Sequence, residues 1–371
     1  MQSSIHLRYA DIITPFGFLD ETVDALLDGK SAVRTGPCFD HPVAFAPFED
    51  DSLRSLKTSC RTLAFRARKG LFDLDPAKTV FVYACAKGDI SPLEEVILND
   101  VEQVAFSPCL QSQAAVAEIM LGGPFADTLV ISNACASGTI GVEVAHELLG
   151  AGYYDHAVCF GCDFLYRFVV SGFYALGALS ASGARPFDAH RDGLTPGESA
   201  ALAILDRTAE GTNGIEILAA ASTNDANHRT GPSRTGEGLY RAARQAVELA
   251  GIAPGDIGGV KCHGTATPYN DAMEAKALLS LFEDAMPPVV SVKGALGHSS
   301  GAGSLCEMIM TAEFCKKRCL PPTINFQKKG VEEPLRVAAH KQALATGTVL
   351  CLAAGFGGVN SAVILKDRSA I

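Results

Sequence analysis

The sequence predicts an α/β protein whose strands pair mostly in parallel. Strand-like apolar runs alternate with helical patterns along most of the chain, as in repeated strand–helix units. No linker rich in Pro, Ser or Gly divides the 371 residues, so we expect one compact unit. Hydrophobic residues make up 48% of the chain and charged residues 19%, which is enough apolar material for a large core.

The expected elements follow one another in a regular order. Helical patterns have apolar residues three or four positions apart, whereas the strand-like runs are short, apolar and bounded by Gly, Pro, Asp or Asn. Strands are expected at 78–86, 127–134, 155–162, 200–206, 213–223, 258–264, 287–294, 348–358 and 361–367. Helices are expected at 18–30, 141–152, 237–251, 271–284 and 303–317.

A faint internal repeat links two of these strand–helix units. VISNACASGTIGVEVAHELL, residues 130–149, can be laid on VSVKGALGHSSGAGSLCEMIM, residues 290–310. In this register Cys135 falls on His298, an offset of 298 − 135 = 163 residues. The repeat predicts two related halves, each presenting a reactive group where a helix begins, although small residues also match by chance.

The charge restricts the possible partners. A net charge of −10 argues against a nucleic-acid binder, because phosphate contacts need clustered Lys and Arg. The first residues, MQSSIHLRYADII, have neither a basic start nor a long apolar run, and no apolar stretch is long enough to cross a membrane. We therefore expect a cytoplasmic protein without membrane insertion, whose 12 cysteines are reduced, buried or catalytic.

One local segment is basic. In LRSLKTSCRTLAFRARKG, residues 53–70, Arg54, Lys57, Arg61 and Arg68 recur near helical spacing. This stripe is either a solvated helix face or a docking site for an acidic partner.

Cys135 is a candidate nucleophile. It follows the run DTLVI and precedes a helical pattern, and the partial positive charge at a helix N-terminus lowers the pKa of a thiol. Its neighbours Ala134, Ala136, Ser137 and Gly138 leave room for a substrate and let a backbone amide approach an oxyanion. A buried core cysteine is the competing interpretation.

His263 lies in KCHGTATPYND, after a short strand-like run. Thr265 and Thr267 offer hydroxyl groups to a polar ligand, and Gly264 permits its close approach. A structural histidine in a loop is the alternative.

Two glycine-bounded turns carry further candidates. In VSVKGALGHSSGAGS, Lys293 and His298 lie five residues apart where a helix begins. Glu307 follows nine residues later in an apolar helix and needs a neutralising partner, for which Lys293 is the candidate. The turn around Phe356, GFGG, either directs backbone N–H groups at an anion or is an ordinary glycine turn.

Together these motifs resemble the β-ketoacyl-acyl-carrier-protein synthases of the thiolase superfamily, in their elongating Cys-His-His branch. Six segments occur in the order of that family: TPFG, NACASG, RPFDAHRDG, HGTATPYND, KGALGHSSGAGS and GFGGVNSAVIL. The resemblance covers nearly the whole chain. It implies a thiolase-like fold of two βαβαβαββ halves in a five-layered αβαβα sandwich, with the nucleophile in 1–210 and both histidines in 211–371.

The resemblance also implies a role for each candidate. Cys135 would accept an acyl chain, while His263 and His298 would assist decarboxylation of malonyl-carrier protein, whose enolate then attacks the thioester. The other implied roles are oxyanion binding by the backbone N–H groups of Cys135 and Phe356, orientation by Lys293, support by Glu307, pantetheine binding by Thr265 and Thr267, and carrier-protein docking by Lys57 and Arg61.

The same resemblance implies the partners. The substrates would arrive on the phosphopantetheine of an acyl carrier protein, with no metal and no other cofactor. The chain would form a homodimer, or a heterodimer with a paralogous ketosynthase.

Several segments depart from the family pattern. The first strand-like run reads IHLRYADIITPFG, the stretch between YALGALS and RPFD is short, Gly294 follows the lysine where Ser is usual, and Ala353 and Ala354 stand where Ser and Phe often precede the GFGG turn. These differences suggest a specialised branch that makes polyene or polyketide-like chains, and they leave the chain preference open.

Three alternatives remain at this point. A chain-length-factor-like subunit would share the fold but usually lacks the cysteine that this chain keeps. GHSSG, residues 297–301, fits the G-x-S-x-G elbow of a serine hydrolase with Ser299 as nucleophile, and His340 is then the only downstream histidine. CFGC, residues 159–162, could be a redox or zinc motif, but its apolar surroundings favour core cysteines.

Overall fold

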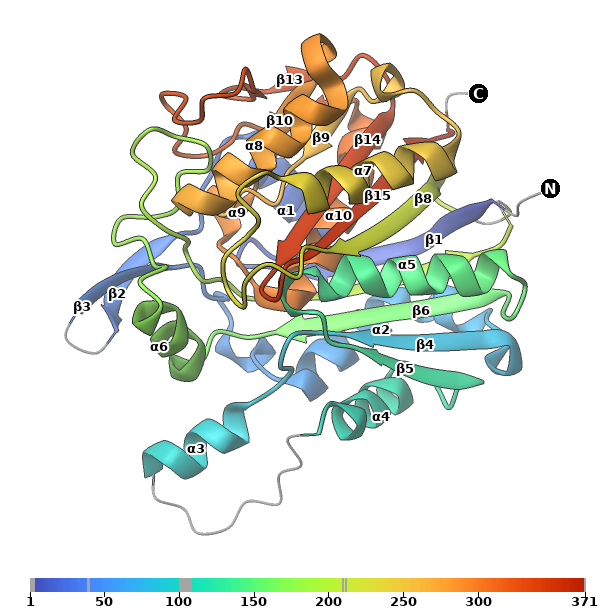
Figure 1. Cartoon of the computed structure of the whole chain (residues 1–371). Coiled ribbons are helices and arrows are strands. Elements are labelled where there is room, and N and C mark those ends of the chain that lie inside the picture. Colours follow the sequence, from blue (N-terminus) through green and yellow to red (C-terminus); the bar gives the residue numbers. More distant parts are fainter. Residues whose placement is uncertain (1–3, 39–40, 100–108, 209, 211, 370–371) are drawn as a thin grey trace.

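A single sheet of eleven strands forms the centre of the computed structural model, which describes residues 4–38, 41–99, 109–208, 210 and 212–369 (Figure 1). Across the sheet the order is β12-β10-β9-β14-β15-β8-β1-β7-β6-β4-β5. These strands are β1 (Ile5–Ile13), β4 (Thr79–Ala84), β5 (Asp127–Ile131), β6 (His156–Asp163), β7 (Ser199–Asp206), β8 (Ile215–Asn224), β9 (Gly259–Lys261), β10 (Pro288–Val290), β12 (Arg336–Val337), β14 (Thr348–Gly355) and β15 (Val359–Asp367). Two small ribbons, β2 (Arg34–Cys38) with β3 (His41–Phe45) and β11 (Cys319–Leu320) with β13 (Gln342–Ala343), lie outside it.

The expectation of mostly parallel pairing was wrong, because the sheet is mixed. The parallel pairs are β5–β4, β4–β6, β14–β9, β9–β10 and β10–β12. The five pairs in the middle of the sheet, from β6–β7 to β14–β15, are antiparallel. A turn as short as 356–358 can join β14 and β15 only as antiparallel neighbours, whereas parallel strands need a long crossover.

The predicted repeat is present in the sheet. In one half the order is β5-β4-β6-β7-β1, and in the other it is β10-β9-β14-β15-β8. In both halves the first two pairs are parallel and the next two antiparallel, and β1 pairs with β8 where the halves meet. The boundary between residues 210 and 211 stays a prediction, and residue 211 lies outside the described part of the chain.

Helices form three layers around the two half-sheets (Figure 1). α5 (Ser137–Gly150) and α10 (Ser300–Lys317) pack against each other and against strands of both halves, so they form the middle layer. α2 (Leu56–Phe72) and α4 (Leu110–Met120) cover the first half, and α7 (Glu237–Ala250) covers the second with α8 (Pro268–Phe282) packed on it. The resulting order is the expected αβαβα sandwich. The remaining helices are α1 (Leu19–Leu27), α3 (Ser91–Asn99), α6 (Arg167–Ala175) and α9 (Lys293–Leu296).

The two middle helices approach each other closely. A Cβ atom added to Gly138 at the start of α5 would lie 2.3 Å from the backbone nitrogen of Leu305 in α10, so glycine is required there. Almost every residue of α10 is buried, as expected for a helix that is covered on all sides. The carboxylate of Glu307 on α10 therefore lies in the interior of the protein. No helix in the described ranges combines the length and the apolar character needed to cross a membrane.

Candidate active site

A cavity of about 460 Å³ lies where the two halves meet. It brings together most of the residues that the sequence singled out, although they are up to 221 positions apart (356 − 135). The lining residues include Cys135, His263, Thr265, Thr267, His298 and Phe356.

A residue with positive φ precedes both Cys135 and His298. Cys135 lies in a short 3₁₀ turn between β5 and α5, and Ala134 before it has a φ of 48°. His298 lies just before α10, and Gly297 before it has a φ of 71°. These two positive-φ residues are 163 positions apart (297 − 134), as in the repeat, but Cys135 then lies in a 3₁₀ turn and His298 in a β-bridge with Pro196. A left-handed alanine is strained, which is typical of a backbone that must present a reactive side chain.

The thiol of Cys135 is not ionised at neutral pH in the unliganded protein. Burial raises its pKa to about 11, although the Lys293 ammonium acts in the opposite direction. The expectation that the start of the helix lowers this pKa was therefore wrong, because desolvation of the sulfur outweighs the favourable charges. Cys135 is nevertheless only partly buried and faces the cavity, which excludes a core cysteine.

The two imidazoles lie against each other on one side of the cavity. His263 follows β9, and its ring centroid is 5.3 Å from that of His298, with the ring planes at 88°. Burial lowers the pKa of His298 to about 3 and that of His263 well below its ordinary value, and the charge of Lys293 adds to both shifts. Each Nδ1 atom is buried without a hydrogen-bond partner among the described residues. Both rings are thus neutral at pH 7, when each can donate one N–H bond and accept another.

A carboxylate that sequence reasoning missed holds the backbone of the His263 loop. Glu274, on α8, accepts hydrogen bonds from the backbone N–H groups of His263 at 2.6 Å and Gly264 at 2.8 Å. An acid eleven residues after a candidate histidine, on the helix that follows it, is the signal that could have found it.

The GFGG turn brings its backbone against the nucleophile. A Cβ atom added to Gly355 would lie 3.1 Å from the backbone nitrogen of Cys135, so a side chain there would crowd that N–H group. The backbone N–H of Phe356 donates toward the Cys135 sulfur. The Phe356 ring is 37% exposed and meets Phe173 of α6 edge-on, with 6.2 Å between the ring centroids.

A buried ion-pair triad lies behind the cavity. Lys293 Nζ is 2.5 Å from Glu307 Oε1, as the sequence predicted. Sequence reasoning missed Lys261, whose Nζ is 2.5 Å from Glu307 Oε2. Burial acts to raise the pKa of Glu307, but the two lysines hold it below its ordinary value, so the carboxylate stays ionised. The missed signal was a lysine within the apolar run GGVKC, because a buried cation needs an acidic partner.

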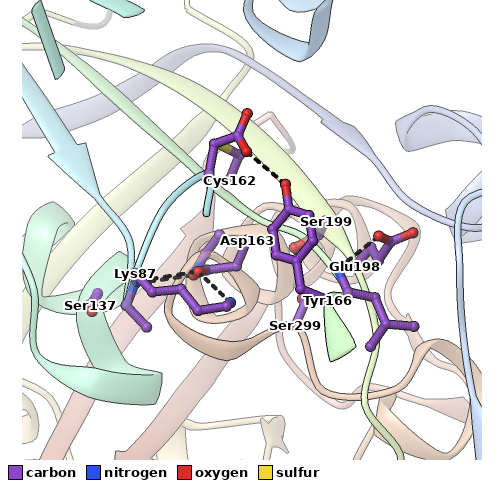
Figure 2. Close-up of polar contacts among 12 residues, drawn as sticks. Lys87, Ser137, Cys162, Asp163, Tyr166, Glu198, Ser199 and Ser299 are labelled. Atoms are coloured by element: carbon purple, nitrogen blue, oxygen red, sulfur yellow. Dashed lines mark hydrogen bonds and ion pairs between the residues drawn. The ribbon is translucent and has the colours of Figure 1, made fainter. Parts of the chain in front are cut away.

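Sequence reasoning also missed Asp163, which ends β6. Its carboxylate accepts from Lys87 Nζ at 3.0 Å and from the backbone N–H groups of Ala86 at 3.1 Å and Ala302 at 2.9 Å, and Figure 2 shows the Lys87 side chain extending to it. Asp163 thereby ties the loop after β4 to the first turn of α10. An acid directly after the apolar run AVCFGC was the available signal.

The threonines and the basic stripe lie in different surroundings. Thr265 and Thr267 both line the cavity, and their Oγ1 atoms are 2.9 Å apart. Lys57 and Arg61 are exposed on α2 and have no ion pair among the described residues. Arg54 does not belong to a free stripe, because it precedes α2 and binds Glu198, with Nε 2.5 Å from Oε1.

The geometry argues against two of the alternatives. Ser299 Oγ is 2.7 Å from Ser199 Oγ, and both residues are buried, whereas a hydrolase nucleophile is hydrogen-bonded to a histidine. Cys159 and Cys162 are at most 1% exposed in the core of β6. Within the described ranges, no cluster of three or more His, Cys, Asp or Glu residues could hold a metal ion.

The raised pKa of Cys135 makes a testable prediction. We expect its alkylation by iodoacetamide to accelerate by close to tenfold per pH unit from about pH 7 to about pH 10, because the reactive thiolate is the minor form over this range. Peptide mass spectrometry after timed quenching measures the rate for this one cysteine. The alkylation rate of a small free thiol in the same tube should level off near pH 9. A Cys135 rate that is already constant between about pH 7 and pH 8 would contradict the prediction.

Comparison with protein families supports the site. The model described as "Beta-ketoacyl synthase, N-terminal domain" matches residues 113–211, and the one described as "Beta-ketoacyl synthase, C-terminal domain" matches residues 215–327. The matched segments contain Cys135 in the first and both histidines, Lys293 and Glu307 in the second.

Individual proteins similar to this chain carry names from the same family. A protein named 3-oxoacyl-[acyl-carrier-protein] synthase 2 from Mycobacterium bovis is 33% identical over 245 residues, which are 62% of this chain and 59% of that protein. One of the same name from Rhizobium meliloti is 32% identical over 252 residues, 64% of this chain and 60% of that protein. The matched part therefore spans about three fifths of these relatives' length.

A solved structure covers more of the chain. The structure named "The ishigamide ketosynthase/chain length factor" superposes with a TM-score of 0.89 at 25% identity, over 99% of this chain and 100% of that one. The fold therefore matches over the whole chain.

Proposed function

Because the chain belongs to the β-ketoacyl synthase family, we propose that it is a β-ketoacyl-ACP synthase that extends an acyl chain held on Cys135. The reaction is a decarboxylative Claisen condensation with malonyl-acyl carrier protein. The proposal depends above all on one observation: the Cys135 thiol, the imidazoles of His263 and His298 and the backbone of Phe356 meet at a single cavity.

The first half-reaction transfers the acyl group. The Cys135 sulfur attacks the thioester carbonyl of the acyl-carrier protein, the bond to the pantetheine sulfur breaks, and that sulfur leaves with a proton. Because the Cys135 thiol is neutral, its proton must be removed during the attack, and a neutral imidazole in the same cavity is a suitable acceptor. The backbone N–H groups of Cys135 and Phe356 stabilise the tetrahedral oxyanion.

The second half-reaction forms the new carbon–carbon bond. Malonyl-carrier protein loses CO₂, and the negative charge moves to the thioester oxygen as an enolate. The N–H groups of His263 and His298 hydrogen-bond that oxygen, because each ring keeps one N–H group in its neutral form. The enolate carbon then attacks the acyl carbonyl, and the bond to the Cys135 sulfur breaks. The sulfur leaves as a thiolate that takes up a proton from water, and the extended chain leaves on the carrier protein.

The remaining residues position the substrates. Thr265 and Thr267 offer hydroxyl groups to the pantetheine arm, and Lys57 and Arg61 on α2 attract an acidic carrier protein. Lys293 acts through its charge, since it does not line the cavity. We further propose a cytoplasmic dimer with an identical or a paralogous chain, acting in fatty-acid, polyene or polyketide-like elongation with no cofactor besides the carrier's phosphopantetheine.

A second candidate is a chain-length-factor-like partner subunit. The similar solved structure favours keeping it, because its name joins a ketosynthase and a chain length factor. The complete set of Cys135, His263, His298 and Lys293 favours the catalytic role, because a supporting subunit needs none of these residues.

One assay separates the two candidates. The purified chain is mixed with acyl- and malonyl-carrier protein, and the product is followed by mass spectrometry, alone and with a paralogous ketosynthase. The catalytic role predicts condensation that requires Cys135 of this chain in either setting. Condensation by the mixed complex that persists in the Cys135→Ala variant would assign the supporting role instead.

A further inference from the structure

We propose that Lys261 is a positioning residue for the condensation reaction: it adds a positive charge behind the cavity and joins the three segments that form the cavity. This inference rests on the proposed function, since it concerns the same site.

Lys261 is completely buried at the end of β9 and makes two close contacts. Its Nζ atom is 2.5 Å from Glu307 Oε2 on α10 and 2.8 Å from the carbonyl oxygen of Leu352 on β14. A fully buried ammonium is costly unless it is paired and hydrogen-bonded, and here it has both partners.

These contacts connect the segments that present the reactive groups. Lys261 precedes His263 by two residues, Glu307 follows His298 by nine, and Leu352 precedes Gly355 by three. One ammonium therefore holds together the strand before the first histidine, the helix after the second, and the strand before the turn that packs against Cys135. Loss of either contact would loosen the spacing of all three.

The charges around Glu307 do not balance. Its carboxylate is 2.5 Å from both Lys261 and Lys293, so two ammonium groups share one negative charge and the triad carries a net charge of +1. Lys293 alone would suffice to neutralise Glu307. The surplus positive charge is therefore the specific contribution of Lys261.

Other charged groups near the triad cancel only part of this surplus. Glu274 on α8 also acts on Lys261, and burial raises its pKa to about 7, so it is only partly ionised at neutral pH. Lys87 and Asp163, on the other side of the cavity, pair with each other. The thiol of Cys351 also faces Lys261 and is neutral, because burial raises its pKa.

A net positive charge at this place suits both half-reactions. It favours the thiolate that forms on Cys135 and the enolate oxygen that forms beside the histidines. It also opposes protonation of His263 and His298, and a doubly protonated imidazole could not accept the thiol proton.

The test measures the thiol directly and needs no condensation. Lys261→Met replaces the ammonium with an apolar chain of similar length, and we expect the iodoacetamide rate of Cys135 at about pH 8 to fall by about two- to fourfold, as its pKa rises by about half to one unit. Lys261→Met combined with Glu307→Gln leaves Lys293 as the single charge, so the rate should return toward that of the original protein. Lys316→Met removes the lysine of a partly exposed pair with Glu313 on α10, away from the cavity, and should leave the rate unchanged.

The outcomes discriminate between an electrostatic and a purely structural lysine. An unchanged rate in Lys261→Met, or a double variant that stays as slow as the single one, would overturn the proposal. If Lys261→Met does not fold, the double variant is compared with Glu307→Gln alone, because removal of Lys261 there lowers the charge of the triad from +2 to +1 and should lower the rate. The alkylation rate of Cys135 can change in these variants even if the protein does not condense substrates. Such a result would refute the proposed function but would leave the electrostatic role of Lys261 supported.

Discussion

Replacement of Cys135 by alanine is expected to reduce condensation by about a thousandfold or more, because the acyl chain then has no covalent acceptor in the cavity. The same variant should show no acyl-enzyme by intact-protein mass spectrometry after incubation with acyl-carrier protein. Cys135 is one of many residues that line the cavity, and its sulfur faces the cavity rather than the core. Loss of the sulfur should therefore not prevent folding.

Cys109 provides the matched control. It is an exposed free cysteine just before α4 and lies outside the cavity. Cys109→Ala should retain both condensation and acylation at their original levels. An acyl-enzyme that forms equally well without the Cys135 sulfur would exclude this residue as the nucleophile.

Replacement of either histidine by alanine is expected to have the second-largest effect. His263→Ala and His298→Ala should each slow the release of CO₂ from malonyl-carrier protein by about a hundredfold to a thousandfold, since each removes one donor to the developing enolate oxygen. Acylation of Cys135 should fall less, because the oxyanion of that step is held by backbone N–H groups.

Two measurements made on the same samples test this difference. CO₂ release reports the decarboxylation, and intact mass reports the acylation of Cys135. His340→Ala is the control, because His340 is exposed and does not line the cavity. Equal losses in both half-reactions, or a large effect of His340→Ala, would contradict the assigned roles, and the latter would favour the hydrolase alternative.

Residues in short motifs could be identified from the sequence, because their signals are local. Cys135 and His298 each follow an apolar run and precede a helical pattern, and small residues surround both. The GFGG turn lies between two strand-like runs, and a short turn between paired strands lies at the ends of those strands. The Lys293–Glu307 pair could be predicted because a helix buried on all sides cannot keep an unpaired acid.

Other features depend on contacts between distant segments. Most of the antiparallel middle of the sheet could not be predicted, because an apolar run is the same in either direction, and only the short turn between β14 and β15 carried a signal. The contacts of Lys261 could not be predicted, because its partners Glu307 and Leu352 are 46 and 91 positions away in the sequence. The pKa of Cys135 was misjudged because the start of the helix is visible in the sequence, whereas the desolvation that outweighs it is not.

The sequence by itself determined which groups this protein can use: one thiol, two imidazoles, a lysine with its acid, and two glycine-rich turns, each at the end of a strand-like run. Only the tertiary structure decided which of these groups share a cavity, which cations share one carboxylate, and which protonation state each group has at neutral pH. The reason is physical. Backbone turns and helix starts follow from neighbouring residues, whereas electrostatic energies depend on burial and on charges that folding brings together from different parts of the chain.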